Sequence, residues 1–297
     1  MLIQPLFYFP TTLVYIDDQR ECLKAIKVTF EDQCPLQLFE STEEAIKFLT
    51  SYRETLSTLS FLRSVSNDQS HDFMENCPID FDVLDIPKLA DNKDRFKEIA
   101  LLIADYDFRQ KDYDGIELCR QFEDLPFKKL LLTGTSSYEL AVTAFNECVI
   151  HHFIQKGVAT LVTELEKSVN NLTKQYFYER TKPLLTILET EGPLPLTDPI
   201  FIQYFEDWRK ENGITEYYLM DKVGSFLCIN AHNQRIHFVV HTNKSLDTFV
   251  NFHHEITDGY IPELLQATQE RKKIPFFGIG HGAWEEEGDA WKPFFYS

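Results

Sequence analysis

The chain has 297 residues, enough for two modest domains, and 43% of them are hydrophobic, so a sizeable core is expected and wholesale disorder is not. Its formal net charge of −18 disfavours direct binding to nucleic acid or to an anionic membrane surface, because both attract positive charge. No apolar stretch approaches the length of a membrane span, and residues 1–10 lack the basic start and the cleavage site of a signal peptide. Six scattered cysteines without a CxxC pair favour reduced thiols, which is typical of a cytoplasmic protein.

The first half of the chain alternates short apolar strands with amphipathic helices. The strands are expected at 13–16, 36–39, 100–104, 129–133 and 150–155, and the helices at 19–32, from 41 onward, 115–123, 136–148 and 158–190. This alternation predicts right-handed crossovers and a parallel sheet that helices cover on both faces. The last helix is longer than one sheet requires, so we expect it to link two domains or to pair with a second copy. Pro183 could end or kink it.

Two regions depart from this alternation. Residues 51–97 are partly polar and turn-like, and we interpret them as an insertion of roughly 40 residues that forms a loop or an added hairpin. Gly192-Pro193-Leu194-Pro195 then suggests a domain boundary. The expected domains are therefore 11–172, the long connecting helix at 158–191, and a smaller α+β domain at 193–297.

The second half has a different pattern of elements. In order, we expect a helix at 198–212, strands at 216–220, 225–229 and 235–241, and helices at 245–257 and 260–272. The connections between the strands are short and polar, as in hairpins, so they predict an antiparallel meander. A tail rich in glycine and aromatic residues follows.

Polar and charged side chains stand at the ends of the first-half strands. Asp17 and Asp18 follow the first strand, Asp105 follows the third, Thr133 ends the fourth and Lys156 follows the fifth. Because the carboxyl ends of parallel strands meet at one edge of a sheet, we expect these side chains to gather there. Three carboxylates, a hydroxyl and an ammonium in one place predict a Mg²⁺-dependent aspartyl-phosphorylation site.

A carboxylate accepts a phosphoryl group only when its repulsion of the phosphoryl oxygens is offset, and Mg²⁺ can provide this while it templates an in-line displacement. In this hypothesis Asp105 is the nucleophile, Asp18 binds the metal directly and Asp17 binds it through water. The backbone carbonyl of Asp107 would complete the coordination.

The ammonium of Lys156 would attract the phosphoryl group, and the hydroxyl of Thr133 would donate a hydrogen bond to it. Each residue alone also has a structural interpretation. Asp17 and Asp18 could cap the following helix, and Asp105 could be a turn residue. A single threonine or lysine at a strand end is usually structural. Their joint occurrence in this order favours the phosphorylation site.

Two groups of motifs carry a resemblance to a known family. They are Ile103-Ala104-Asp105-Tyr106-Asp107 with Asp114-Gly115-Ile116-Glu117-Leu118, and Leu132-Thr133-Gly134 through Ala144-Phe145-Asn146 to Phe153-Ile154-Gln155-Lys156. With them, residues 12–172 resemble the receiver domain of two-component response regulators, the fold of the chemotaxis receiver proteins. The resemblance implies a doubly wound α/β fold with a five-stranded parallel sheet in the order 2-1-3-4-5. It also implies Mg²⁺ as the cofactor and a sensor histidine kinase as the partner.

The resemblance further implies a role for each residue of the site. Asp105 falls on the phospho-acceptor, Asp17 and Asp18 on the acidic pair, Thr133 and Lys156 on the conserved switch residues, and Phe153 on an aromatic position whose side chain swings inward when Thr133 engages phosphate. It implies a homodimer through the face formed by the helix at 136–148, the strand at 150–155 and the long helix, near Ala141, Val142 and Val149. No enzymatic activity is expected beyond the formation and loss of the aspartyl-phosphate.

The sequence departs from the receiver pattern at two places. Ten residues separate Asp105 from Gly115, where receivers usually have eight, and counting back eight from Gly115 reaches Asp107. We keep Asp105 as the acceptor because it directly ends the apolar strand. Gly157 stands where receivers usually have proline. Both changes could slow phosphorylation, or they could indicate a phosphate-independent pseudo-receiver that serves as a scaffold.

The second half matches no common effector, because it has no helix-turn-helix, zinc or cyclase motif. The glycines of 276–282 lack the lysine of a phosphate loop. His237, His241 and His253-His254 could form a metal site, or an enzyme centre with the glycine-rich tail, but such histidines are more often surface or core residues. The segment 216–227 weakly resembles receiver-linked regions of unassigned role, one of them in a quorum-signalling regulator of Legionella. The pattern suits a module for a nucleotide, a nucleic acid or a protein, and the sequence leaves these open.

Overall fold

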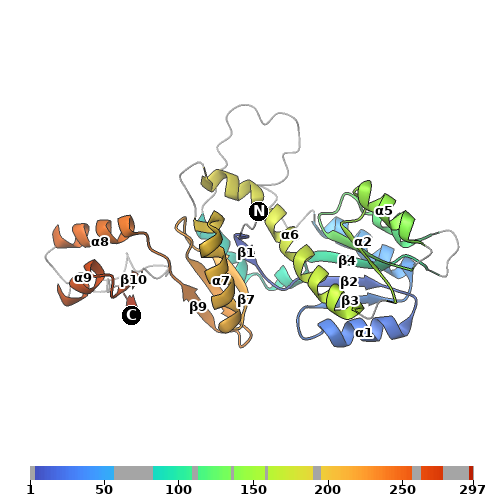
Figure 1. The fold of residues 1–297 in the computed structure, drawn as a ribbon, viewed down its shortest axis with the longest axis horizontal. Helices are drawn as coiled ribbons and strands as arrows, with labels where there is room; N and C mark the ends of the chain where they lie inside the picture. Colours follow the sequence, from blue (N-terminus) through green and yellow to red (C-terminus); the bar gives the residue numbers. More distant parts are fainter. Residues whose placement is uncertain are drawn as a thin grey trace, which may run out of the picture.

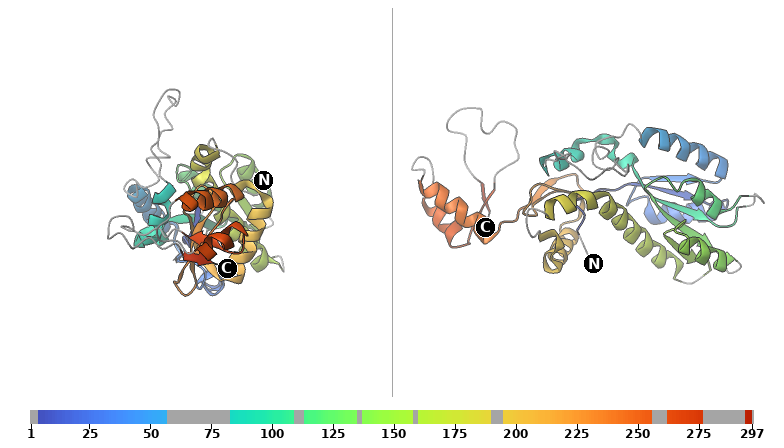
Figure 2. Two further views of the ribbon diagram at one scale, coloured as in Figure 1. Left: turned by 90° about the vertical axis from the view of Figure 1, so that its left-hand side faces the viewer. Right: turned by 90° about the horizontal axis from the view of Figure 1, so that it is seen from above.

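Two sheets organise the protein. The computed structural model describes residues 4–56, 83–108, 113–134, 137–157, 160–189, 195–255, 262–276 and 294–296. Within them a five-stranded parallel sheet and a four-stranded antiparallel sheet lie in a row, and a two-helix unit follows beyond the second sheet (Figure 1). The view from above shows the same extended arrangement (Figure 2).

The parallel sheet is built from β2 (Thr12–Ile16), β3 (Leu36–Phe39), β4 (Ile99–Asp105), β5 (Lys128–Thr133) and β6 (His152–Gln155). Its order is β3-β2-β4-β5-β6, and all neighbouring strands pair in parallel. Counted from β2 as the first strand, this is the order 2-1-3-4-5. The prediction of a doubly wound α/β receiver fold is therefore confirmed.

Helices cover both faces of this sheet. One face carries α1 (Arg20–Phe30) and α6 (Leu161–Glu189), and the other carries α2 (Thr42–Leu56), α4 (Gly115–Gln121) and α5 (Tyr138–Asn146). Successive residues of a strand point to opposite faces, so Leu13 and Tyr15 of β2 pack with α1 and α6, while Val14 and Ile16 pack with α2 and α4. Burial on both faces explains why the central strands β2 and β4 are almost continuously apolar.

The long helix α6 connects the two sheets (Figure 1). Its first turns place Leu165 and Val169 in the core of the parallel sheet, and its last turns place Leu184 and Leu188 in the core of the antiparallel sheet. Pro183 lies inside the helix and does not end it. The helix thus acts within one chain as the link between the two sheets.

The antiparallel sheet has the order β1-β7-β8-β9. Its strands are β1 (Phe7–Tyr8), β7 (Ile214–Leu219), β8 (Phe226–Asn230) and β9 (Arg235–Phe238). The last three form the expected meander, whereas β1 was not foreseen. The helix α7 (Pro199–Glu211) covers one face of the sheet, where the ring of Phe205 stacks on that of Phe226 with centroids 4.6 Å apart.

The segment expected as an insertion joins the two sheets as well. Its first residues belong to α2, residues 57–82 lie outside the described part of the chain, and the remainder forms the 3-10 helices η2 (Val83–Asp91) and η3 (Lys93–Lys97). The alternative of an added hairpin is wrong for 83–97, because η2 buries Val83 and Ile86 against the antiparallel sheet instead of pairing as strands. The guanidinium of Arg95 also donates to both carboxylate oxygens of Glu216 on β7, at 2.9 and 3.1 Å.

The last described elements form a separate small unit. They are α8 (Asn243–Glu255), α9 (Pro262–Gln269), β10 (Ile274–Phe276) and β11 (Phe294–Tyr296), with β10 and β11 paired antiparallel. Most of the glycine-rich tail, 277–293, lies outside the described residues, and so does the boundary segment 190–194. None of the helices described is both long and apolar enough to cross a membrane.

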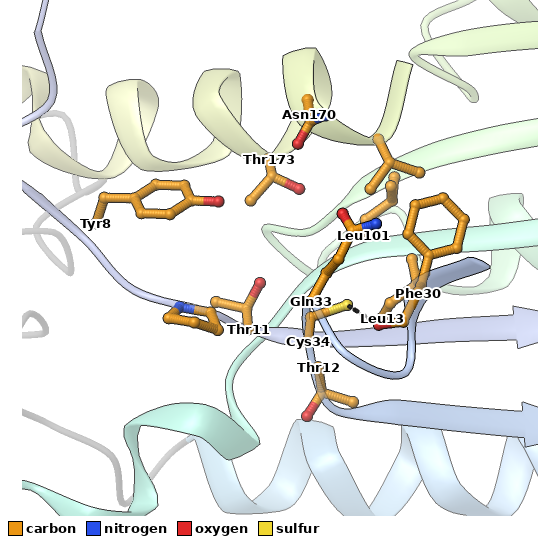
Figure 3. Close-up of a pocket in the computed structure, with 12 residues that line it drawn as sticks. Tyr8, Thr11, Thr12, Leu13, Phe30, Gln33, Cys34, Leu101, Asn170 and Thr173 are labelled. Atoms are coloured by element: carbon orange, nitrogen blue, oxygen red, sulfur yellow. Dashed lines mark hydrogen bonds between the residues drawn. The ribbon is translucent and has the colours of Figure 1, made fainter. Parts of the chain in front are cut away.

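A small cavity of about 50 Å³ lies where α6, the end of α1 and the segment between β1 and β2 meet (Figure 3). Polar side chains line it, among them Tyr8 at the end of β1, Gln33 just after α1 and Thr173 of α6. Its size suits ordered water and not a cofactor. It lies at the amino end of β2, away from the carboxyl ends of the strands.

Candidate functional site

Three carboxylates meet at the carboxyl ends of β2 and β4. The strands are neighbours and pair Ile16 with Ala104, so the residues that follow these two positions emerge side by side. Oxygen atoms of Asp17, Asp18 and Asp105 all lie within 4.8 Å of one another. Asp17 and Asp105 are buried, and Asp18 is half-buried.

The ammonium of Lys156 bridges two of these carboxylates. Its Nζ lies 2.8 Å from Oδ2 of Asp105 and 3.0 Å from Oδ2 of Asp17. The backbone N–H of Lys156 donates to the carbonyl of Thr133 at 2.8 Å, which fixes the end of β6 beside β5. Burial lowers the pKa of Lys156, but the carboxylates of Asp105 and Asp17 raise it by more than burial lowers it. The net shift of this pKa is therefore upward, and the side chain stays charged.

Burial also governs the charge of Asp105. It raises the pKa of Asp105 above the ordinary value of 3.8, although Lys156 partly offsets this effect, and the nearby Asp17 raises the pKa as well. Asp17 and Asp105 thus share the ammonium of Lys156, and the carboxylate of Asp18 lies within 4.8 Å of theirs. A divalent cation would offset the mutual repulsion of carboxylates gathered this closely.

The structure distinguishes Asp105 from Asp107 as the candidate phospho-acceptor. Asp107 is exposed. Its backbone N–H donates a hydrogen bond to the carboxylate of Asp105. A Cβ atom on Gly115 would lie 2.2 Å from the carbonyl oxygen of Asp105, so α4 begins directly against this residue despite the long connection. Residues 109–112 of that connection lie outside the described part. Asp105, and not Asp107, belongs to the carboxylate cluster; a ligand role for the Asp107 carbonyl stays a prediction.

The two expected switch positions lie on the neighbouring strands. Thr133 is fully buried at the end of β5, and its hydroxyl donates to the carbonyl of Gly134 at 3.2 Å. The ring of Phe153 on β6 is half-buried and lies edge-on to those of Tyr138 and Phe145, with centroids 5.4 and 6.1 Å away. Phe153 thus contacts exposed side chains of α5.

Two residues that the sequence analysis did not predict also contact the carboxylate cluster. The hydroxyl of Tyr15 donates to Oδ2 of Asp17 at 2.7 Å, and burial raises the pKa of the Cys22 thiol, which also hydrogen-bonds Asp17. The signal for Tyr15 was present, because residues two apart in a strand share one face. Cys22 lies in the first turn of α1, which starts just after the carboxylates.

The structure also places the residues near the expected dimer face and the histidines of the second half. Ala141 and Val149 are buried in the core beneath α5, so they are not available to a partner, and Val142 is half-buried. The exposed apolar side chains near that face are Tyr138, Leu140, Phe145 and Val162. Among the described side chains, neither His237 nor His241 belongs to a group of three ligands that could hold a metal ion.

The donor set of the cluster fits Mg²⁺. Carboxylate oxygens are hard ligands of the kind that this ion prefers, and one or two carboxylates usually suffice because the ion keeps several waters. Asp18 is half-buried, so water can reach the cluster from its side. If bound, Mg²⁺ would be held by Asp17, Asp18 and Asp105.

Several solved structures are similar to this chain. The response regulator LqsR of Legionella pneumophila is 27% identical, with a TM-score of 0.72, over 93% of this chain and 80% of its own. A receiver domain protein from Clostridium thermocellum (17% identity, TM-score 0.36, 56% of this chain and 95% of its own) also matches. So does the signal receiver domain of a Vibrio parahaemolyticus Luxo repressor protein (16% identity, TM-score 0.38, 57% of this chain and 95% of its own). No protein-family model matches the chain, and no curated protein matches it.

The likeness to LqsR extends over both sheets, because it covers nearly the whole chain. The order of the parallel sheet agrees with it independently. The chain therefore has the receiver fold of response regulators, joined to a smaller unit with an antiparallel sheet, and it resembles the Legionella regulator along most of its length.

Proposed function

We propose that this chain is the response regulator of a two-component phosphorelay and that Asp105 accepts the phosphoryl group from a sensor histidine kinase. One observation carries the proposal: three carboxylates and the ammonium of Lys156 converge at the carboxyl ends of β2 and β4. Oxygens of three carboxylates within 4.8 Å of one another are hard ligands in an arrangement that suits a divalent cation.

The chemistry follows from the charges of these residues. An oxygen of Asp105 attacks the phosphorus of a phosphohistidine, the new O–P bond forms as the N–P bond breaks, and the imidazole leaves with the electron pair. When bound, Mg²⁺ supplies charge neutralisation for the phosphoryl oxygens. Lys156 stands 2.8 Å from Asp105 and is placed to turn from the carboxylate to the phosphoryl group.

The proposed response involves the neighbouring strands. Thr133 would exchange its bond with the carbonyl of Gly134 for one to a phosphoryl oxygen. Phe153 would then move inward, away from Tyr138 and Phe145. Both changes would alter the surface formed by α5, β6 and α6, which would favour one partner over another.

The same surface is our candidate for a dimer contact. Tyr138, Leu140, Phe145 and Val162 are between 44% and 54% exposed, which leaves an apolar surface for a second copy. Sedimentation velocity with and without phosphodonor would test this, and a Leu140→Glu variant should weaken any dimer. Unchanged monomer under both conditions would reject the dimer contact.

The decisive experiment is intact-mass spectrometry of the full chain after incubation with Mg²⁺ and acetyl phosphate. We expect one phosphoryl adduct in the wild type and in Asp107→Asn, and none in Asp105→Asn. An adduct that survives in Asp105→Asn but not in Asp107→Asn would move the acceptor to Asp107. No adduct in any protein, together with no Mg²⁺ binding, would favour the alternative of a phosphate-independent pseudo-receiver scaffold.

A further inference from the structure

Tyr15 brings a hydroxyl from the hydrophobic core to the carboxylate cluster. Its side chain is 1% exposed and packs with residues of α1 and α6, among them Leu23 and Leu165. Its phenolic O–H donates to Oδ2 of Asp17 at 2.7 Å. A phenylalanine would serve the packing equally well, and it would avoid the cost of burying a hydroxyl. The hydroxyl therefore calls for an explanation beyond packing.

Several donors hold Asp17, and the thiol of Cys22 is one of them. The backbone N–H of Gln19 donates to Oδ1 at 2.8 Å, while Tyr15 and Lys156 both donate to Oδ2. These donors differ in how firmly they are placed. The Gln19 amide is part of the chain at the start of α1, and Tyr15 is fixed by the packed core. Lys156 is 24% exposed and is shared with Asp105, so it can turn away.

We propose that Tyr15 is a positioning residue that holds Asp17 in its cation-binding orientation when Lys156 turns to the phosphoryl group. This inference rests on the proposed function of the cluster. Once the ammonium leaves, the hydroxyl of Tyr15 would still donate to Oδ2 of Asp17, held in place by the packed core. Hydrogen bonds from such supporting residues orient metal-binding carboxylates, and their loss usually weakens metal binding tenfold or more.

The test is a Mg²⁺ titration of the full-length wild type and Tyr15→Phe by isothermal titration calorimetry. We expect the dissociation constant of Mg²⁺ to rise about tenfold in Tyr15→Phe, and phosphorylation by acetyl phosphate to slow at subsaturating Mg²⁺. At saturating Mg²⁺ the rate should return towards that of the wild type, because the acceptor itself is intact.

Tyr52→Phe is the matched control. Tyr52 is another buried tyrosine, packed on the other face of the same sheet, and its hydroxyl accepts a hydrogen bond from the N–H of Ile99, at the end of β4 opposite to Asp105. Removal of this hydroxyl should lower stability and leave the affinity for Mg²⁺ unchanged. A general effect of removing a buried hydroxyl would instead weaken binding in both variants, which would overturn the proposal.

A double variant shows whether Tyr15 acts through Asp17. In the background of Asp17→Asn, the Tyr15→Phe substitution should cause no further loss of affinity. Wild-type affinity in Tyr15→Phe would overturn the role of Tyr15 while the proposed function stands. Absence of Mg²⁺ binding in the wild type would overturn both, so the two failures are distinguishable.

Discussion

Lys156 Nζ lies 2.8 Å from Oδ2 of Asp105, and this contact joins the end of β6 to the end of β4 across the intervening strand β5. The two residues are far apart in sequence, and the parallel order of the sheet brings them together. The contact is also temporary in the proposed mechanism, because the same ammonium must serve the incoming phosphoryl group. The ion pair thus describes the resting state of the site.

Replacement of Lys156 should expose the repulsion within the cluster. Lys156→Met leaves Asp17 and Asp105 buried without their shared cation, so we expect a loss of about 1–3 kcal/mol in the free energy of unfolding in EDTA. Mg²⁺ should stabilise this variant more than the wild type, because the metal replaces the missing charge. Urea unfolding with and without Mg²⁺ measures both effects. The exposed Lys24 provides the control variant Lys24→Met, and an equal gain from Mg²⁺ in all three proteins would contradict the expectation.

The pH dependence of stability should report the burial of Asp105. Its pKa in the folded chain is raised above 3.8, so the folded state keeps this proton to higher pH than the unfolded chain does. Stability from this group is present below that value and is lost as the pH rises through the folded pKa. In EDTA, Asp105→Asn should lack this loss and should gain stability relative to the wild type as the pH rises from about 4 to neutral. Urea midpoints over this range are the measurement, and parallel curves for the two proteins would refute it.

Gly115 should tolerate no side chain. A Cβ atom there would lie 2.2 Å from the carbonyl oxygen of Asp105 and 2.8 Å from Cδ1 of Leu131, so the backbone of β4 or α4 must shift. For Gly115→Ala we expect a loss of about 1–3 kcal/mol in stability and slower phosphorylation of Asp105.

Gly157→Ala is the comparison for that variant. Gly157 has φ +86°, and a Cβ atom placed on it would have no neighbouring atom within 4 Å, so its substitution costs only the left-handed conformation, about 1–2 kcal/mol. Proline, usual at this position in receivers, cannot adopt such a φ. Thermal unfolding and the rate of adduct formation separate the two variants. A normal phosphorylation rate in Gly115→Ala would show that the site accommodates the shift.

The ion pair between Arg95 and Glu216 should join the two sheets energetically. Both side chains are at most 10% exposed, so Arg95→Leu leaves a buried carboxylate and should cost about 3–5 kcal/mol. Arg235→Leu is the control, because it removes the exposed pair with Asp91, which likewise connects a 3-10 helix to a strand of the antiparallel sheet. Its loss should cost about 0–1 kcal/mol.

The double variant Arg95→Leu with Glu216→Leu should recover much of the loss, because no charge is then left buried alone. The measurement is urea unfolding followed by circular dichroism. Equal, small effects of Arg95→Leu and Arg235→Leu would show that the buried pair does not hold the sheets together.

The order of the parallel sheet was predicted from the resemblance to receiver domains. The positions of the cluster could be predicted from sequence, because the strands that carry it are short apolar runs that end in distinctive polar residues. The same reasoning failed where the signal depends on distant partners. Phe7 and Tyr8 form a strand only because β7 lies beside them, and two residues carry no periodicity. Arg95 and Glu216 are unremarkable charges until the fold buries them together. The spacing of Tyr15 and Asp17 places both on one face of β2, but only the structure shows that the hydroxyl of Tyr15 reaches the carboxylate.

The pairing of β1 with β7 has a consequence for synthesis of the protein. Phe7 leaves the ribosome before its partner Tyr218, which follows only after the whole parallel sheet and α6 have been made. The parallel sheet can therefore form while β1 is still unpaired, and the apolar side chains of β1 must stay uncovered or be shielded until β7 emerges. Completion of the antiparallel sheet then closes the longest loop between paired strands in the described fold, and we expect this step to be the slow one in folding.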